Sequence, residues 1–518
     1  MDARLAAAWA LLPDYLGQHV LVSACALVLG LAISLPLAVA AARSAAVRWP
    51  ALLLASLIQT IPSLALLALF YPLLLALSTL SRGAFGHGFA ALGFLPSLLA
   101  LTLYSMLPIL RNGVAGLTGV DPAVVEAARG VGMTDRQRLF QVELPLAAPV
   151  IMAGVRTAAV WTIGAATLAT SVGQTSLGNY IFSGLQTENW VLVLFGCGAS
   201  AALAMAADQL LGLIERGLAT RSQWRIVAGA GGLVAGTLLA LSPLALAGQS
   251  AGAAHYVIGA KNFSEQYILA DVMADRLKAA GATVDTRQDL GSNIAYDALK
   301  AGEIDAYVDY SGTLWANVLK RTDNPGREAV LSQLTTALKQ RDGVVVLGSL
   351  GFENAYALAM RRAEAEQLHI VTLDDLTLHA PQLTLGADLE FLSRPEWKSV
   401  KDAYGLAFKR QVQFQPTFMY NALTSGQADV ISAFSSDGRI SADDLVTLAD
   451  PRHALPPYDA VILISPKRAN DARLIGALKP LVGRIDVAAM RQANFSVDRD
   501  QDKATPADAA RALEARLH

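Results

Sequence analysis

Six apolar runs, each long enough to cross a lipid bilayer, lie within the first 246 residues of this 518-residue chain. A helix needs about twenty apolar residues to cross the hydrocarbon core of a membrane. The runs are residues 20–42, 51–77, 89–110, 146–170, 190–214 and 226–246. After residue 250 the pattern changes to that of a soluble α/β protein. We therefore expect a membrane half and a soluble half in one polypeptide, in agreement with a mean hydropathy of +0.40.

The short links between the runs predict which side of the membrane each half occupies. Lys and Arg residues in short connections favour the cytoplasmic side. Three alternate links are basic, and their residues are Arg43 and Arg48; Arg111, Arg129, Arg136 and Arg138; and Arg216, Arg221 and Arg225. The other links hold Arg82 or no basic residue. This pattern places the N-terminus outside. After six crossings the soluble half also lies outside, on the periplasmic face of the inner membrane.

The sixth run has two interpretations. Arg221 and Arg225 precede it, and it ends in Ala245-Leu246-Ala247, which is the layout of a secretory signal with a small-residue cleavage site. The run is longer than the apolar core of about 7–15 residues that is typical of a signal. We therefore favour a retained sixth helix, with cleavage after Ala247 as the alternative.

Composition and motifs argue against several classes of function. The net charge of −2 lacks the basic excess of a nucleic-acid-binding protein. Cys25 and Cys197 lie in apolar runs, so a disulfide framework and a thiolate metal site are not expected. The seven histidines show no paired metal-ligand spacing, and no nucleophile with a partner base stands out, so we expect neither an enzyme nor a bound cofactor. A phosphate-binding loop of the Gly-x-x-x-x-Gly-Lys-Ser/Thr type is also missing.

A spaced motif lies in the basic link between the third and fourth runs. Its residues are Glu126, Ala127, Ala128, Gly132, Leu144 and Pro145. Gly132 permits a tight turn, and Pro145 is tolerated in the first turn of the following helix. The arrangement resembles the coupling loop of the membrane subunits of binding-protein-dependent ABC importers. The resemblance implies a separate cytoplasmic ATPase that consumes ATP, and two membrane subunits over two ATPases. A homodimer of this chain in the lipid bilayer is then the economical assembly.

Polar residues within the runs are the remaining features of the membrane half. The segment 59–63, Gln-Thr-Ile-Pro-Ser, interrupts the second run, and such breaks are tolerated where they line a water-filled path. Gln59 and Pro62 are therefore candidates for the transport pathway. Arg156 and Asp208 are ionisable groups near or within spans, which by default suggests function. Each lies toward the cytoplasmic end, however, so a structural pair or snorkelling to the membrane surface explains them at least as well.

The soluble half alternates short aliphatic strands with helical stretches, which predicts parallel sheets. Its length suits two lobes, and the cleft between lobes is the default ligand site. We expect an all-α membrane domain of about six helices fused to a two-lobed α/β domain like those of periplasmic binding proteins. The predicted divisions are a permease-like part at 1–225 with the loop at 121–145, a sixth helix and linker at 226–253, and the soluble domain at 254–518. Its lobes are predicted at about 254–357 with 441–518, and at about 358–440.

Dispersed blocks of the soluble half are similar to the extracytoplasmic binding proteins of quaternary-amine osmoprotectant importers. The blocks are residues 259–269, 309–313, 351–352, 356–358, 393–395, 416–420 and 455–460. In that family a trimethylammonium group sits in a box of aromatic faces, and the resemblance assigns the box to Tyr310, Tyr356, Tyr420 and Phe434. It assigns a ligand carboxylate to Lys261, Thr313 and Arg394.

The chemistry of these residue types agrees with such a ligand. A quaternary ammonium has no N–H to donate, whereas each desolvated π face attracts its charge by about 0.5–2 kcal/mol. Arg394 offers a planar fork for a carboxylate, and Lys261 adds a point charge.

Two departures from the family pattern leave the ligand's identity open. Asp309-Tyr310-Ser311-Gly312 replaces the usual Glu-Tyr-Thr-Gly, and Phe434 replaces a common Tyr. Glycine betaine and carnitine satisfy both ends of the site, whereas choline lacks the carboxylate. Ergothioneine, which a related branch with similarly fused chains imports, has both groups and a thione ring. A membrane sensor is the less favoured alternative function, since the links predicted to be cytoplasmic are too short for an output domain.

Overall fold

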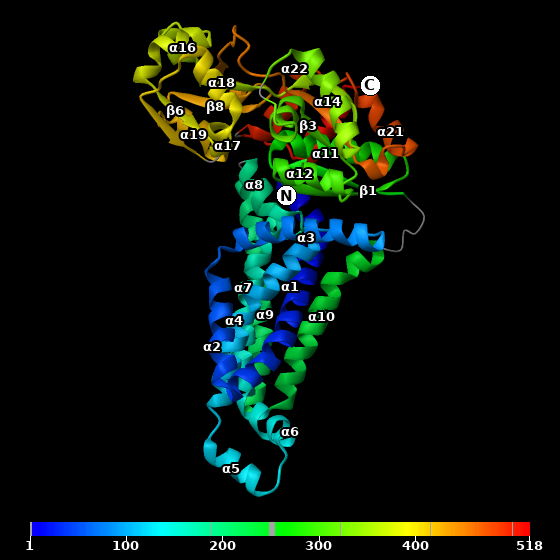
Figure 1. Cartoon of the computed structure of the whole chain (residues 1–518), viewed down its shortest axis with the longest axis vertical. Coiled ribbons are helices and arrows are strands. Elements are labelled where there is room, and N and C mark those ends of the chain that lie inside the picture. The colour runs from blue at the N-terminus through cyan, green and yellow to red at the C-terminus, as the bar shows by residue number, and fades with distance from the viewer. Residues whose placement is uncertain are drawn as a thin grey trace. The chain divides into compact units, whose positions relative to one another are not determined.

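The computed structural model describes residues 3–187, 189–247, 254–321, 323–414, 416–499 and 501–517. It divides into two compact units (Figure 1). The membrane unit comprises residues 1–182 and 191–251, and the soluble unit comprises residues 183–190 and 252–518. The linker after Ala247, where the alternative cleavage was considered, lies outside the described residues.

Helices form the membrane unit, and the end of one of them, α8, belongs to the soluble unit at residues 183–186. They are α1 (Ala3–Arg43), α2 (Ala45–Thr60), α3 (Ser63–Phe85), α4 (Phe94–Thr118), α5 (Pro122–Gly130), α6 (Asp135–Arg138), the π-helical turn η1 (Leu139–Glu143), α7 (Leu144–Ala166), the 3₁₀ turn η2 (Thr167–Val172), α8 (Gly178–Gln186), α9 (Trp190–Thr220) and α10 (Gln223–Ala247). Among the described residues, six helical segments are long and apolar enough to cross a membrane. The all-α membrane architecture predicted from the sequence is therefore confirmed.

The second apolar run is not one helix. The break falls within the predicted segment 59–63, because α2 ends at Thr60 and α3 begins at Ser63. Proline disfavours helical geometry in the residue before it, and Ile61 is extended, with φ −73° and ψ 126°. The hydroxyl of Tyr104 on α4 donates a hydrogen bond to the freed carbonyl of Ile61. Figure 1 shows α3 lying across the bundle, whereas α2 runs along it.

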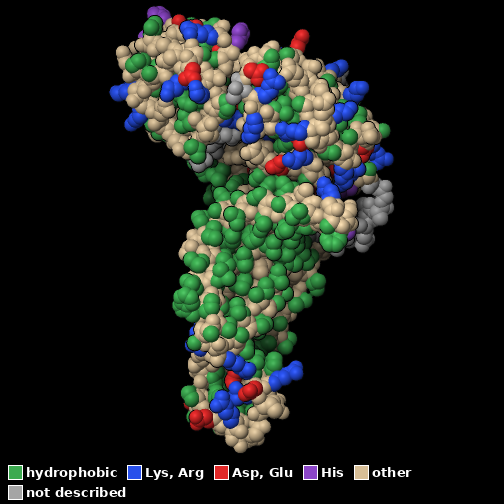
Figure 2. Space-filling view, viewed as in Figure 1, with side chains coloured by type: hydrophobic (Ala, Val, Ile, Leu, Met, Phe, Trp, Pro, Cys, Tyr) green, Lys and Arg blue, Asp and Glu red, His purple; other side chains and the backbone are tan. Residues whose placement is uncertain are grey.

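Close helix contacts and an apolar exterior characterise the bundle. Gly154 of α7 packs on α4 so closely that a Cβ there would lie 2.7 Å from the carbonyl oxygen of Pro108. Small residues permit such approaches between membrane helices. Leu54, Leu194 and Leu239 are more than 60% exposed on the outside. Figure 2 shows hydrophobic side chains over most of the visible bundle and charged groups gathered around α5 and α6.

Two five-stranded sheets form the core of the soluble unit. Their strands are β1 (His255–Lys261), β2 (Thr283–Leu290), β3 (Ala306–Tyr310), β4 (Val345–Glu353), β5 (Tyr356–Arg361), β6 (Thr384–Ala387), β7 (Arg410–Gln413), β8 (Val430–Phe434), β9 (Leu445–Thr447) and β10 (Asp459–Ile464). The first sheet has the order β2-β1-β3-β10-β4, and the second β7-β6-β8-β5-β9. The predicted two-lobed α/β architecture is present.

The sheets are mixed rather than wholly parallel. Strands β1, β2 and β3 are parallel, as are β6, β7 and β8, but β10 and β5 run antiparallel to their neighbours. The chain crosses directly from β4 into β5 and returns to the first sheet at β10, so these strands enter from the opposite end. Strand β9 belongs to the second sheet, although the sequence estimate placed residues 441–518 in the first lobe.

Helices and helical turns connect the strands of the soluble unit. They are α11 (Ser264–Ala279), α12 (Ser292–Ala301), α13 (Ser311–Thr313), η3 (Leu314–Val318), α14 (Arg327–Asp342), α15 (Arg362–Gln367), α16 (Leu373–His379), η4 (Ala380–Gln382), α17 (Leu389–Ser393), α18 (Pro395–Tyr404), α19 (Pro416–Thr424), α20 (Arg439–Ala442), η5 (Pro466–Arg468), α21 (Ala472–Leu478), η6 (Lys479–Leu481), α22 (Val487–Asp498) and α23 (Pro506–Glu514). Strands β3 and β10 are buried along their whole length.

Candidate ligand-binding site

A cavity of about 160 Å³ lies between the two lobes of the soluble unit. Its lining residues in this unit include Lys261, Phe263, Ser264, Glu265, Ser292, Tyr310, Thr313, Asn354, Tyr356, Asp388, Arg394, Phe434, Ser436, Asp437, Arg439, Tyr458, Asn494 and Asp498. Parallel strands present their carboxyl ends to a ligand in α/β folds. Strands β1, β3 and β8 end at lining residues, and β6 ends just before one. The antiparallel β5 and β10 begin at these edges, so six strands converge on the cavity.

Aromatic rings form one part of the lining. Tyr356 and Phe434 are cross-strand partners on β5 and β8, and their ring centroids lie 4.7 Å apart. Tyr458 meets Tyr356 edge-on, with centroids 5.4 Å apart. Tyr310 stacks on Phe263 at 6.1 Å. Three of the four predicted box residues, Tyr310, Tyr356 and Phe434, therefore line one cavity, and their role in binding stays a prediction.

Tyr420, the fourth predicted box residue, lies behind the cavity lining. It is buried in the core of the second lobe, where it packs with residues of β5, β8 and β9. The guanidinium carbon of Arg439 lies 4.0 Å from its ring centroid, and Arg439 lines the cavity. Tyr458 and Phe263 supply aromatic faces that the sequence prediction did not assign. Both lie in sequence blocks that carry the family resemblance.

Lys261 is held in a buried ion pair. Its ammonium contacts the Oδ1 atom of Asp309, and the two side chains are 4% and 1% exposed. The hydroxyl of Tyr307 donates to the other oxygen of Asp309 at 2.6 Å. A ligand carboxylate would therefore compete with Asp309 for Lys261. The predicted carboxylate role falls more naturally on Arg394 and Thr313, both of which line the cavity.

Arg394 is buried at the junction of α17 and α18. Pro395 begins α18, and the residue before a proline favours extended geometry, as Arg394 has with φ −82° and ψ 151°. Its guanidinium carbon lies 5.4 Å from the Tyr356 ring centroid. The Nη1 atom lies 3.5 Å from the Oε1 atom of Glu396, which also accepts a hydrogen bond from Tyr458. The cation is therefore positioned beside the aromatic faces.

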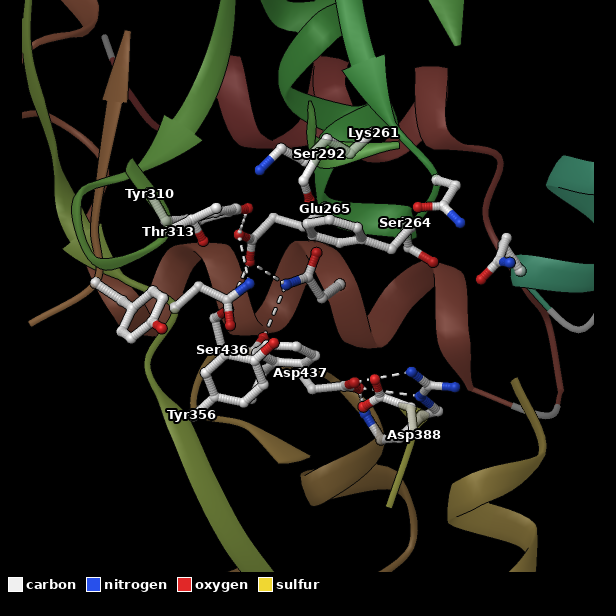
Figure 3. Close-up of a pocket in the computed structure, with 18 of the residues that line it drawn as sticks. Lys261, Ser264, Glu265, Ser292, Tyr310, Thr313, Tyr356, Asp388, Ser436 and Asp437 are labelled. Atoms are coloured by element: carbon white, nitrogen blue, oxygen red, sulfur yellow. Dashed lines mark hydrogen bonds and ion pairs between the residues drawn. The ribbon is translucent and has the colours of Figure 1, made fainter. Parts of the chain in front are cut away.

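Glu265 is a buried acid of the cavity that the sequence prediction did not assign. Its Oε1 atom accepts hydrogen bonds from Tyr310 at 2.5 Å and Asn354 at 3.1 Å. Its Oε2 atom accepts from Ser436 at 2.6 Å and Asn494 at 2.8 Å. Figure 3 shows Glu265 between Tyr310 and Ser436. Burial raises the pKa of Glu265, and the four hydrogen bonds oppose this rise. Only Ser436 comes from the second lobe, so Glu265 joins the lobes.

A second charged group contains Arg439, Asp437 and Asp498. Arg439 binds Asp437 through two contacts, of 3.1 Å from Nε and 2.8 Å from Nη2. Burial favours protonation of Asp437, but the adjacent guanidinium outweighs it and keeps the pKa below the usual value. Burial raises the pKa of Asp498 to about 7, and Ser264 donates to its carboxylate at 2.6 Å. The cavity therefore combines π faces with several acids and a few held cations.

Two family models match the chain. The model of the substrate binding domain of ABC-type glycine betaine transport systems matches residues 254–513. The model of the inner membrane component of binding-protein-dependent transport systems matches residues 32–220. The chain belongs to the ABC-type glycine betaine transport family. It joins a permease domain to a substrate-binding domain, as expected from the sequence, and this is a transport family rather than an enzyme family.

Several relatives of this chain are named as transport proteins. The ergothioneine transport permease/ergothioneine binding protein of Helicobacter pylori (strain G27) is 29% identical, over 85% of this chain and 79% of that protein. The choline transport system permease protein of Bacillus subtilis (strain 168) is 38% identical over 40% of this chain and 89% of its own length. A crystal structure of a glycine betaine/carnitine/choline ABC transporter protein matches 51% of this chain and 100% of its own, with 26% identity and a TM-score of 0.46.

The predicted coupling residues of the permease domain occupy a short helical pair. Glu126, Ala127 and Ala128 lie on α5, whose N-terminus is capped by Asp121 through a 2.9 Å bond from the Ala123 amide. Gly132 adopts φ +85°, as a tight turn requires. Leu144 and Pro145 begin α7. The large apolar side chains of Val124 and Val131 are 39% and 77% exposed.

An ion-pair network that sequence reasoning missed joins this loop to the bundle. Arg138 is buried and contacts Glu143 at 2.6 Å and Asp135 at 2.8 Å. Glu143 also lies 3.9 Å from Arg43, the last residue of α1. Arg138 immediately precedes the π-helical turn η1 and Glu143 ends it, so this turn brings Arg138 and Glu143 together. π-Helical turns within helices occur frequently at functional sites.

The other polar residues of the permease domain have defined surroundings. Arg156 and Asp208 form a two-contact pair of 3.0 and 2.9 Å, so the pairing considered from the sequence is present. Arg156 also contacts Glu215 at 2.6 Å. The side-chain nitrogen of Gln59 is buried and has no hydrogen-bond partner among the described residues. The pathway role predicted for Gln59 and Pro62 stays a prediction.

Proposed function

We propose that this chain imports small trimethylammonium zwitterions, which its binding domain captures in the cavity at the converging strand ends. The observation that carries the proposal is the aromatic lining formed by Tyr310, Tyr356, Phe434 and Tyr458 around one small cavity that also contains Arg394. Aromatic faces attract a quaternary ammonium, which has no N–H for hydrogen-bond acceptors. The guanidinium of Arg394 complements the carboxylate at the other end of such a ligand.

Glu265 strengthens the part of the proposed site that binds the ligand's trimethylammonium group. Gln266 donates a hydrogen bond to the Tyr310 oxygen at 3.0 Å, so the Tyr310 hydroxyl directs its own proton at Glu265. The side-chain amides of Asn354 and Asn494 also donate to Glu265. This pattern of donors matches the ionised carboxylate. Its negative charge lies at the hydroxyl end of Tyr310 in the cavity lining and attracts a trimethylammonium group bound there.

Glycine betaine and carnitine are the first candidate substrates, since each has a trimethylammonium group and a carboxylate. Choline would leave Arg394 without a ligand anion. Ergothioneine is the second candidate, and the fused Helicobacter pylori relative, which aligns with 85% of this chain, favours it. Ergothioneine has the same two charges, and its ring carries N–H groups that can donate hydrogen bonds to the carboxylates of the cavity.

We propose that a separate cytoplasmic ATPase drives import and that two copies of this chain form the permease. The exposed apolar side chains of Val124 and Val131 on the coupling loop support a protein partner there, because such residues are normally buried. In the proposed cycle, ligand closes the two lobes, and the closed domain docks on the outward face of the permease. ATP binding and hydrolysis by the partner then move the coupling loop and open the pathway inward, with no cofactor bound by this chain.

We propose that the chain lies in the inner membrane with its binding domain on the periplasmic side. The basic residues of the links around Arg43, Arg129 and Arg216 support this orientation.

Binding measurements on variants test the aromatic site. Tyr356→Ala and Phe434→Ala should each weaken binding of glycine betaine to the purified full-length chain by about 2- to 30-fold, as loss of one cation–π contact implies. Phe418→Ala is the matched control, since Phe418 is 46% exposed and lies outside the cavity lining. Isothermal titration calorimetry measures all three. Unchanged affinity in both cavity variants would exclude this site.

A further inference from the structure

A second cavity adjoins the proposed ligand site. Its volume is about 430 Å³, and its lining residues are Gly291, Ser292, Asn293, Ile294, Asn317, Lys320, Ser393, Arg394 and Pro395. Ser292 and Arg394 also line the first cavity. Both lobes contribute, because α12 and η3 belong to the first lobe and the α17–α18 junction to the second. We call the first cavity the inner chamber and the second the outer chamber.

The two chambers differ in charge. The inner chamber has the carboxylates of Glu265, Asp388, Asp437 and Asp498 in its lining. The lining of the outer chamber contains two cations, Arg394 and Lys320, and no carboxylate among the described residues. Its other polar groups are amides and hydroxyls, which can donate hydrogen bonds. The inner chamber also contains Lys261 and Arg439, which are paired with Asp309 and Asp437, so its charges are mixed, whereas the charged groups that line the outer chamber are cations.

Lys320 is the second positive group of the outer chamber. It follows η3, is exposed, and has φ +56°, a left-handed conformation that is uncommon for residues other than glycine. Sparsely populated backbone conformations cluster at ligand clamps and other functional sites. Lys320 makes no salt bridge with any described residue, whereas Arg394 lies 3.5 Å from Glu396. Lys320 therefore keeps a positive charge available in the chamber.

We infer that the outer chamber binds the anionic or strongly polar far end of a trimethylammonium compound longer than glycine betaine. This inference rests on the proposed function. Glycine betaine has a single methylene between its two charged groups, so a molecule held on the aromatic faces reaches no farther than Arg394. Carnitine separates the same groups by a longer chain, and in ergothioneine a ring with a polarised thione branches from the carbon that carries both charged groups. Such a far end enters the outer chamber and meets Lys320 and Asn317.

The geometry assigns different tasks to the two cations. Arg394 borders both chambers and can bind the carboxylate of short and long ligands alike. Lys320 lines only the outer chamber, so it distinguishes ligands by length. A positive charge at an exposed position contributes modestly to affinity, and salt screens its effect.

Titration of the purified full-length chain in detergent tests this inference. The ligands are glycine betaine and the tighter-binding of carnitine and ergothioneine. Lys320→Gln should weaken the longer ligand about three- to five-fold, and Lys320→Glu should weaken it more, because an exposed ion pair contributes modestly. Both variants should leave glycine betaine within about two-fold of its original affinity. Lys339→Gln, which removes an exposed charge on α14 outside both chambers, is the control.

The outcomes separate this inference from the proposed function. Failure of the unsubstituted chain to bind any of the three ligands would overturn the proposed function. Binding of glycine betaine without either longer ligand would overturn only the inference. Equal losses for short and long ligands, or no loss for the longer ligand in Lys320→Glu, would also overturn it. Raising the salt concentration should reduce the difference between Lys320 and its variants for the longer ligand.

Discussion

Replacing Glu265 by glutamine, which removes one negative charge from the cavity, should weaken ligand binding strongly. At a separation of about 6 Å and an effective dielectric constant of about 20, one unit charge attracts another by about 3 kcal/mol. Loss of that attraction corresponds to about a 100-fold weaker affinity for a cation on the aromatic faces. Glu265→Gln keeps the volume of the side chain while it removes the charge.

The same substitution should also destabilise the binding domain. Each carboxylate oxygen of Glu265 accepts from two donors, so the new amide group would face one such pair. Buried donors left without an acceptor cost about 1–3 kcal/mol. We therefore expect Glu265→Gln to lower the melting temperature while unfolding remains cooperative, as differential scanning calorimetry would show.

Calorimetric titration with glycine betaine measures the effect on binding. Glu328→Gln is the matched control, because Glu328 is exposed on α14 and lies outside the cavity. The control should bind as the unsubstituted chain does. A folded Glu265→Gln protein that binds glycine betaine within two-fold of the unsubstituted chain would refute the reasoning about this carboxylate.

Two further predictions concern stability and coupling. Burial raises the pKa of Asp289 to about 7 in the folded protein. As the pH rises from about 4 to 7, the folded protein therefore loses the contribution of the protonated side chain, and its free energy of unfolding falls. Asp289→Asn keeps an acceptor for the Tyr267 hydroxyl and suits the backbone φ of +64°. It should therefore raise the melting temperature more at pH 7.5 than at pH 5. The control Asp285→Asn, on the exposed side of β2, should show no such difference between the two pH values. Glu143→Gln should reduce ATP-driven ligand uptake several-fold in cells while titration shows unchanged ligand affinity, because the buried Arg138 loses the more buried of its two charged partners. Asp135→Asn, whose carboxylate is 76% exposed, should affect uptake little, and equal effects of the two variants would contradict a joint at Glu143.

The general architecture could be predicted because it depends on local patterns. Long apolar runs give membrane helices, and short aliphatic runs between helices give the strands of an α/β domain. The second run shows the limit of this reasoning. Its composition is apolar throughout, yet Pro62 divides it, and the hydrogen bond from Tyr104 that satisfies Ile61 comes from another helix.

The details of the site depend on contacts between distant residues. The donors to Glu265 include Asn354, Ser436 and Asn494, which are separated from it by 89, 171 and 229 positions. No local pattern indicates that these groups meet. Tyr420 shows a second limit, since this aromatic residue of a family block lies behind Arg439 rather than in the lining, and its role in the box stays a prediction.

Ion pairing was equally hidden from sequence reasoning. Lys261 stands at the end of β1, where the family resemblance places the ligand carboxylate, but Asp309 on β3 already neutralises it. Because side-chain partners across a sheet are set by strand order, the pairing of Lys261 with Asp309 could be identified only from the fold. Arg394 and Lys320 emerge as the groups that a ligand anion can approach.

Titration of the purified full-length chain with glycine betaine, carnitine, choline and ergothioneine tests the central claim most directly. The account predicts saturable binding of at least one zwitterion, competition among the zwitterions that bind, and weaker binding of choline, which offers no carboxylate to Arg394. Tyr356→Ala should weaken the binding of every zwitterion that the unsubstituted chain binds. Absence of binding by every trimethylammonium compound, or equal binding of choline and the zwitterions with no effect of Tyr356→Ala, would contradict the account.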